Sequence, residues 1–131
     1  MNNNRGSRVA VVALALLSMG GNALAAGAAQ EGFLTGPQIR AAIAGKSVGD
    51  ERHWEHKYFA DGRLERSESG RHKAGRWSVQ DDRLCLLKPE IDPDRPLCFR
   101  VLRHGDQVEY HDDRYAVYRG VIRRMTSAPA P

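Results

Sequence analysis

The two cysteines of this 131-residue chain are the residues whose chemistry the sequence constrains most strongly. Cys85 and Cys98 lie within and at the end of the stretch LCLLKPEIDPDRPLC. A zinc site uses about four ligands, usually in close pairs such as C-x2-C, and a thioredoxin-like redox pair has the spacing C-x-x-C. Neither spacing occurs here, whereas an isolated, widely spaced pair suits a disulfide in an oxidising compartment. The sequence therefore predicts a Cys85–Cys98 disulfide.

A second candidate for chemistry is the H-x-x-H pair formed by His53 and His56. This spacing presents two imidazoles together only on a helix, because residues three apart on a strand point to opposite faces. The aromatic neighbours and the Asp61-Gly62 turn favour a strand, so we expect no metal site here. Surface or turn positions are expected for the remaining histidines, His72, His104 and His111.

An acidic loop lies between the cysteines. Glu90, Asp92 and Asp94 alternate through it and supply the oxygen ligands that a hard cation such as calcium prefers. The segment lacks the glycine and terminal glutamate of an EF-hand loop, and its prolines stiffen it. The favoured interpretation is a solvated acidic loop whose negative charge is partly neutralised by Arg95. Cation binding by this loop is left open.

The sequence contains no recognisable catalytic grouping. Its serines lie in no G-x-S-x-G context, and both cysteines are assigned to the disulfide, which removes a thiol nucleophile. Carboxylates are abundant in expected turns, yet none is paired in an apolar pocket that would raise a pKa. We therefore expect a protein that is not an enzyme and has no cofactor.

Two sets of residues are candidates for binding. The Arg-rich stretch RLERSESGRHKAGR offers cationic contacts to a partner, namely Arg63, Arg66, Arg71, Lys73 and Arg76. The alternative is an aromatic-lined cavity for a small ligand, built from Trp54, Tyr58 and Trp77, since aromatic faces give large contact areas with a polar edge. Core packing of these aromatic residues competes with that alternative.

The N-terminal residues predict export. Arg5 and Arg8 precede the apolar run VAVVALALLSMGG, and small residues around Ala23-Leu24-Ala25 form an A-x-A cleavage site. This is the layout of a secretory signal peptide over residues 1–25, and the run is shorter than the roughly 20 residues of a spanning helix. We expect a periplasmic or secreted protein without a membrane span after cleavage.

The charge of the remaining chain argues against nucleic acid. Removing Arg5 and Arg8 from the 20 Lys and Arg residues leaves 18 against 16 Asp and Glu, a net charge of +2. Arginine is interleaved with acidic residues, which is typical of a mixed solvated surface and not of a nucleic-acid stripe. The oligomeric state is not indicated by the sequence.

One short helix and then strands must position these residues. Residues 26–32 read as a flexible start, and TGPQIRAAIAGK has Thr35 as N-cap, Pro37 in the first turn, Ile39 and Ile43 on one face, and Gly45 at the end. The rest of the domain, residues 33–122, alternates with period two between turns. Residues 123–131 have the composition of a disordered tail.

The strand segments predict a mainly β, α+β domain of one short N-terminal helix and six or seven strands in an antiparallel meander, forming a small barrel or sandwich. Trp54, His56 and Tyr58 share one face of their strand. In the two cysteine strands, Leu84, Leu86, Leu97, Phe99 and Val101 form the expected core face. Both cysteines project from the opposite face, where antiparallel pairing brings them within bridging range, and we expect the helix to cover that face.

The order of LTGPQIRAAIAGKSV, YFADGR, GRWSVQDDRLCL and CFRVLRHGD resembles small exported bacterial domains of uncharacterised function. The resemblance covers residues 33–122 and rests on Gly75, Trp77, the Asp61-Gly62 turn and the two cysteines. It implies export and the disulfide. We therefore expect a non-enzymatic binding module that contacts an envelope component or a protein partner, with a small-ligand carrier as the alternative.

Overall fold

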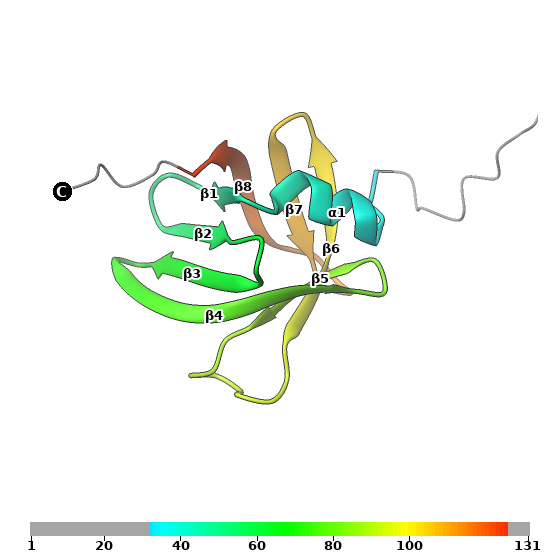
Figure 1. The fold of residues 1–131 in the computed structure, drawn as a ribbon. Coiled ribbons are helices and arrows are strands. Elements are labelled where there is room, and N and C mark those ends of the chain that lie inside the picture. Colours follow the sequence, from blue (N-terminus) through cyan, green and yellow to red (C-terminus); the bar gives the residue numbers. More distant parts are fainter. Residues whose placement is uncertain (1–31, 126–131) are drawn as a thin grey trace, which may run out of the picture.

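A computed structural model describes residues 32–125 and shows one helix and eight strands in a closed antiparallel barrel (Figure 1). The expected signal peptide, residues 26–31 and the chain after residue 125 lie outside the described residues. The elements are α1 (Gly36–Ile43), β1 (Lys46–Gly49), β2 (Trp54–Tyr58), β3 (Arg63–Glu68), β4 (Arg71–Gln80), β5 (Arg83–Leu87), β6 (Leu97–His104), β7 (Gln107–His111) and β8 (Ala116–Arg124). The mainly β class with one short helix is confirmed, although the strand count is eight.

The barrel is an up-and-down meander in which each strand pairs with the next and β8 pairs with β1. Connections therefore alternate between two ends. The end that carries α1 and the β2–β3, β4–β5 and β6–β7 turns is called the helix end. The end that carries the β1–β2, β3–β4, β5–β6 and β7–β8 connections is called the loop end.

The helix begins and ends where the sequence predicts. Thr35 caps it with a capping box in which Gln38 bonds back to the N-cap backbone, and Gly45 follows its end with φ 73°. Asp82 in the β4–β5 turn accepts a 2.6 Å hydrogen bond from the Gly36 backbone N–H, which fixes the helix N-terminus to the barrel. The fully buried Ile39 closes the helix end. This eight-residue helix is too short to cross a membrane, and residues 32–125 contain no other that could.

The barrel interior is filled by inward-facing side chains. Its buried hydrophobic core comprises Ile39, Ala42, Ile43, Val48, Tyr58, Leu64, Trp77, Leu84, Leu86, Phe99, Val101, Val108 and Tyr110. The core assignment for the two cysteine strands holds for four of five residues. Leu97 is 45% exposed, because it is the first residue of β6 and lies at the loop end.

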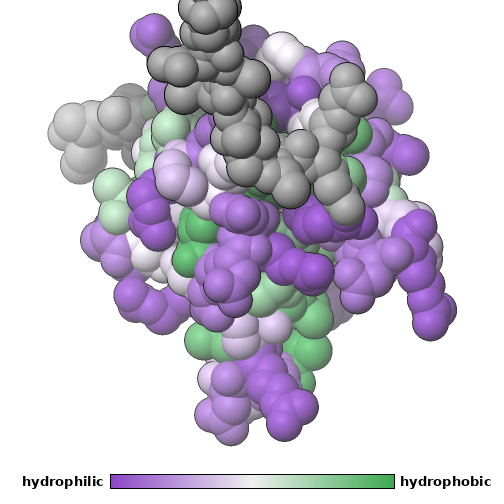
Figure 2. All heavy atoms as spheres, turned by 90° about the vertical axis from the view of Figure 1, so that its right-hand side faces the viewer, coloured by the Kyte–Doolittle hydropathy of each residue, from purple (hydrophilic) through white to green (hydrophobic). Residues whose placement is uncertain are grey.

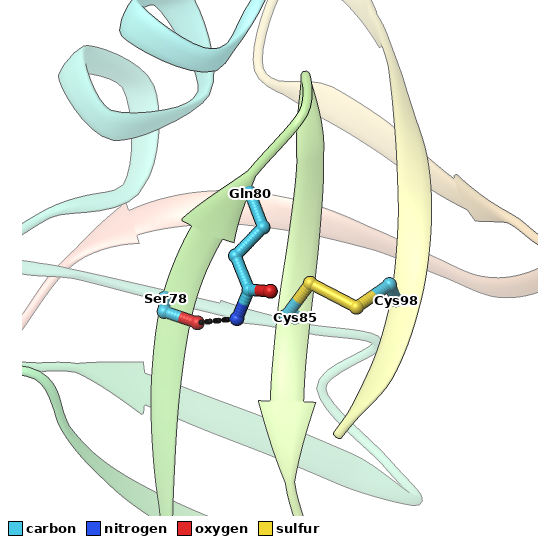
Figure 3. Close-up of a disulfide and its surroundings, with 4 residues drawn as sticks. All are labelled: Ser78, Gln80, Cys85 and Cys98. Atoms are coloured by element: carbon cyan, nitrogen blue, oxygen red, sulfur yellow. Dashed lines mark hydrogen bonds between the residues drawn. A yellow bond between two sulfur atoms is a disulfide. The ribbon is translucent and has the colours of Figure 1, made fainter. Parts of the chain in front are cut away.

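The disulfide lies on the outer face of the barrel and joins β5 to β6 (Figure 3). Cys85 and Cys98 are direct cross-strand partners, as strand parity predicts. Cys85 is buried although it faces outward, and Ser78 lies next to it in register on β4. The expectation that the helix covers this face is wrong, since α1 packs on the helix end through its buried isoleucines. Such a bond is compatible with an oxidising compartment.

One strand and one domain boundary differ from those that the sequence predicts. Strand β1 was not expected, because four residues ending in glycine carry no clear alternation. Arg123 and Arg124, placed by the sequence in the tail, belong to β8, where they pair with Ser47 and Lys46 of β1 and so complete the barrel. Pairing with β1 thus extends β8 two residues beyond Ile122.

Candidate functional site

Charged side chains face the interior of the barrel toward its loop end. This inner charge cluster consists of His56, Arg66, Glu68 and Lys88, together with the neutral Tyr118 and with Glu90, a partly exposed residue of the β5–β6 connection. His56, Arg66 and Lys88 are all at most 5% exposed. Buried charges are strongly unfavourable unless each finds a partner, so their contacts decide what the cluster does.

Arg66 joins the β3–β4 hairpin to the β5–β6 connection. Its Nη2 donates to both carboxylate oxygens of Glu90, at 2.6 and 2.7 Å, and to the carbonyl oxygen of Ala74. Gly75 provides the room, because a Cβ there would stand 2.6 Å from the Leu87 carbonyl oxygen and 3.4 Å from Arg66 Nε. The guanidinium therefore anchors the acidic loop to the barrel interior.

Glu68 is surrounded by donors. Its Oε1 accepts from His56 Nε2 at 2.9 Å and from Lys88 Nζ at 3.1 Å, and its Oε2 accepts from Arg66 at 3.3 Å. Burial alone raises the pKa of this carboxyl, but the hydrogen bonds from His56 and Lys88 outweigh it and lower the pKa to about 2. Glu68 is an ionised acceptor whose lone pairs are engaged, which does not suit a general base.

His56 is held neutral by its surroundings. Burial lowers its pKa to about 4, against the raising effect of Glu68. Donation from Nε2 to Glu68 leaves Nδ1 as the acceptor, facing the Tyr58 hydroxyl at 3.4 Å, and that hydroxyl lies 2.9 Å from the Tyr110 hydroxyl. Burial raises the pKa of both tyrosines, so they remain neutral phenols.

Lowering the pH from about 6.5 to about 4 is expected to destabilise the fold through His56. The unfolded imidazole, with an ordinary pKa near 6.5, binds a proton in this range, whereas the folded one, with a pKa of about 4, stays neutral. The stability that the neutral His56 imidazole contributes is therefore fully present above pH 6.5 and is lost as the pH falls toward 4. The urea midpoint, measured across this range, should fall.

The matched variants are His56→Gln, which removes the buried imidazole, and His53→Gln, which changes an exposed one at the start of β2. H56Q should reduce the dependence in the upper part of this range, above the pH at which carboxylates titrate in the unfolded chain, and H53Q should retain it. Parallel curves for H56Q and the wild type would contradict the buried neutral imidazole.

The inner charge cluster is thus neutral overall and internally matched. Two cations, Arg66 and Lys88, face two carboxylates, Glu68 and Glu90, and Lys88 also donates to the Tyr118 hydroxyl at 2.6 Å. In this arrangement the ionisable groups bond one another. Such a network fixes the relative positions of the hairpin and the loop, and it favours a structural role.

The structure does not bring the five predicted cationic contacts together on one face. Arg66 points inward and is buried, because it follows Leu64 and precedes Glu68 on the inner side of β3. Arg63 and Arg76 are cross-strand neighbours on the outer face near the helix end. Arg71 and Lys73 lie at the loop end of β4, with Lys73 Nζ 3.9 Å from Glu90.

A groove of about 360 Å³ crosses the outer face of β2, β3 and β4. We call it the outer groove; its lining comprises the outward-facing Glu55, Lys57, Glu65, Ser67, His72 and Ala74, together with Lys73 and the buried Arg66, which share the opposite parity. The charges along it are mixed in sign. Of the predicted cations, Lys73 is the partly exposed one that borders this groove.

The predicted aromatic residues lie inside the barrel. Tyr58 and Trp77 are buried in the core, in edge contact with ring centroids 5.6 Å apart, and Trp77 donates to the Phe59 carbonyl oxygen. Trp54 is half-buried nearer the loop end and packs on Tyr118, 5.0 Å away. These rings contact one another and other core side chains, which gives little support to the small-ligand carrier.

Exposed apolar residues gather at the loop end. In the described part of the chain the large exposed hydrophobic residues are Ile91, Leu97, Tyr115 and Val117. They lie on or next to the β5–β6 and β7–β8 connections, and Ile91 and Tyr115 are each 64% exposed. The β5–β6 connection projects from the barrel, and hydrophobic residues surround its base (Figure 2).

The residues that the sequence offered as candidate metal ligands, the H-x-x-H histidines and the acidic loop, do not come together in one site. His53 bonds Asp50, whereas His56 is inside the barrel. Of the acidic loop, Glu90 binds Arg66, and Asp92 accepts from the backbone N–H groups of Asp94 and Arg95. Within residues 32–125, no group of three or more His, Cys, Asp or Glu side chains is placed to hold a metal ion.

No family model, no curated protein and no solved structure matches this chain. Sequence reasoning missed Glu68, Lys88 and Tyr118, and it missed the contacts that join them to His56, Arg66 and Glu90 in the inner charge cluster. Arg66 and Glu68 alternate with polar Glu65 and Ser67, so hydrophobicity alone does not mark an inner face. The inner position of Arg66 and Glu68 could have been predicted from Leu64, because residues two and four positions further along a strand face the same side as an apolar core residue.

Proposed function

We propose that this protein is a non-enzymatic binding module of the periplasm or the extracellular medium. It contacts a protein or another envelope component with its loop end and the adjoining β3–β4 hairpin. The observation that carries the proposal is the gathering of exposed apolar residues at that end. Ile91 and Tyr115 provide apolar area, while Arg71 and Lys73 provide charge beside it.

The inner charge cluster supports this proposal by fixing the contact surface. Arg66 ties the β5–β6 connection to the hairpin through Glu90, and the disulfide ties β5 to β6 at the base of the same connection. A surface held in one arrangement loses less conformational entropy on binding. Export supplies the oxidising compartment that the disulfide requires.

A photo-reactive amino acid placed in the exported protein tests the proposal. Substitution at Ile91 or Tyr115 should give a specific crosslinked product, because both side chains project at the loop end. Gln107, exposed at the helix end, is the control position and should give none. Crosslinking from Gln107 alone would place the contact elsewhere and contradict the proposal.

Charge reversal tests the contribution of the hairpin. The double variant Arg71→Glu, Lys73→Glu should reduce recovery of the crosslinked partner at least tenfold, because each reversal replaces attraction with repulsion. Arg119→Glu, on the outer face of β8, is the matched control. Retention of all partners by the double variant would remove the hairpin from the interface.

A further inference from the structure

A second, separate surface lies at the helix end, where a hollow of about 450 Å³ is bordered by Lys46, Arg103, Asp106 and Arg124 together with Ala41 and Ala42 of α1. The helix contacts mainly β1, β4 and β5. By the up-and-down strand order, the end of β8 and the β6–β7 turn lie at the same end of the barrel as α1. We call Lys46, Arg103 and Arg124 the basic cluster.

The strand register places like charges directly opposite each other in this hollow. Lys46 of β1 pairs with Arg124 of β8, and both continue the inward parity set by Val48 and Ile122. Arg103 continues the inward parity of Val101 on β6. Like charges on directly opposed residues destabilise a sheet. The pairing of β1 with β8, which closes the barrel, therefore places two repelling cations, Lys46 and Arg124, opposite each other at the helix end.

Carboxylates do not relieve this repulsion within the described chain. Neither Lys46 nor Arg124 forms an ion pair among residues 32–125, and Arg103 uses its Nε to bond the Gly105 carbonyl oxygen. Asp106 is the one acidic residue among those lining the hollow. Arg123, which also borders it, is paired with Glu51. The basic cluster exceeds Asp106 by two positive charges.

The geometry of the donors indicates which anion suits the hollow. Two guanidinium groups offer planar pairs of N–H donors that match phosphate oxygens, and an ammonium adds a point charge. Two excess charges suit a dianionic group better than a single carboxylate. The aliphatic side chains of Ala41, Ala42 and Ile122 border the hollow and suit the less polar part of a larger ligand.

We propose that the basic cluster at the helix end binds a phosphate group of an anionic ligand. The phosphate belongs either to a soluble phosphorylated molecule or to a lipid headgroup, since both present the same chemistry. Binding would relieve the repulsion between Lys46 and Arg124. This proposal does not depend on the loop-end contact, because the two surfaces lie at opposite ends of the barrel.

Titration with pyrophosphate at fixed ionic strength is the first test. The wild type should bind saturably by calorimetry, and the unfolding temperature should rise with pyrophosphate and not with matched chloride. The double variant Arg103→Gln, Arg124→Gln should lose at least about tenfold in affinity. Arg119→Gln, on the outer face of β8, should bind as the wild type does.

Two further variants separate binding from a merely structural role. Asp106→Asn should raise the affinity for pyrophosphate by up to about fivefold, because it removes the opposing carboxylate. Arg124→Gln should stabilise the free protein in chloride, because it removes the like-charge pair. Equal affinities for the wild type and the double variant, or no saturable binding, would overturn the proposal.

Vesicles distinguish the two sources of phosphate. Cosedimentation with phosphatidylglycerol vesicles but not with phosphatidylcholine vesicles, lost in the double variant, would support a lipid headgroup. Pyrophosphate binding without cosedimentation would support a soluble ligand. Cosedimentation that survives in the double variant, together with unchanged pyrophosphate affinity, would overturn the assignment of the site.

Discussion

Replacing Arg66 by alanine is expected to lower the free energy of unfolding by about 3 kcal/mol, the lower end of the range for breaking a buried ion pair, because Glu68 and Glu90 remain partly exposed to solvent. The guanidinium of Arg66 is fully buried, and it donates to Glu90, Glu68 and the Ala74 carbonyl oxygen. Without it, Glu90 loses its bidentate partner, Glu68 keeps only Lys88 as a cationic partner, and a cavity forms beside Gly75. Equilibrium urea unfolding measures the difference.

Arg63→Ala is the matched control for this prediction. Arg63 lies on the same strand but faces solvent, where it pairs with Asp61 at 2.8 Å. Exposed pairs of this kind contribute little, so R63A should change the free energy of unfolding by about 0.5 kcal/mol or less. Similar effects of R66A and R63A would mean that the inner charge cluster does not form in solution.

Removing the disulfide should have an effect of similar size. The double variant Cys85→Ala, Cys98→Ala should lose on the order of 3 kcal/mol, because the bond closes a loop with a sequence separation of 13 residues and restricts the unfolded chain. Ser78→Ala is a useful control, since Ser78 lies beside Cys85 on the same outer row. It should change stability by less than about 1 kcal/mol.

The disulfide prediction fails if the wild type with oxidised cysteines and the double alanine variant unfold at the same urea concentration. A reduced wild type should resemble the variant. Because Cys85 is buried and Cys98 is half-buried, reduction under native conditions should be slow.

The alternation of side chains between the two faces of each strand accounts for most of what the sequence predicts about the fold. It placed Trp54, His56 and Tyr58 on one face, which lies inside the barrel, and it placed both cysteines together on the face opposite the core, which lies outside the barrel. These predictions depend only on the period of two and on antiparallel pairing. The helix was predicted equally well, since Thr35, Pro37 and Gly45 are strong local signals for its start and its end.

Barrel closure was beyond local reasoning. Strand β1 is four residues long and is specified by its pairing with β2 on one side and β8 on the other. That pairing also draws Arg123 and Arg124 into β8. Neither the register nor the resulting opposition of Lys46 and Arg124 follows from the residues near them in the sequence.

The inner charge cluster required contacts across the barrel. Arg66 was read as a surface cation because it lies in a strongly charged stretch. Its partner Glu90 lies 24 positions away in a connection with no regular period. Hydrophobic patterning cannot predict such a pair, because the charges stabilise each other only after both segments are placed.

Native mass spectrometry of the protein from its exported fraction, repeated after denaturation, tests the central claim most directly. The account predicts a mass two hydrogens below that of the reduced chain, no small-molecule adduct, and a complex with a macromolecular partner that the Arg71→Glu, Lys73→Glu variant loses. A small ligand that is retained natively and released on denaturation, with no macromolecular complex, would contradict the binding module and favour the carrier.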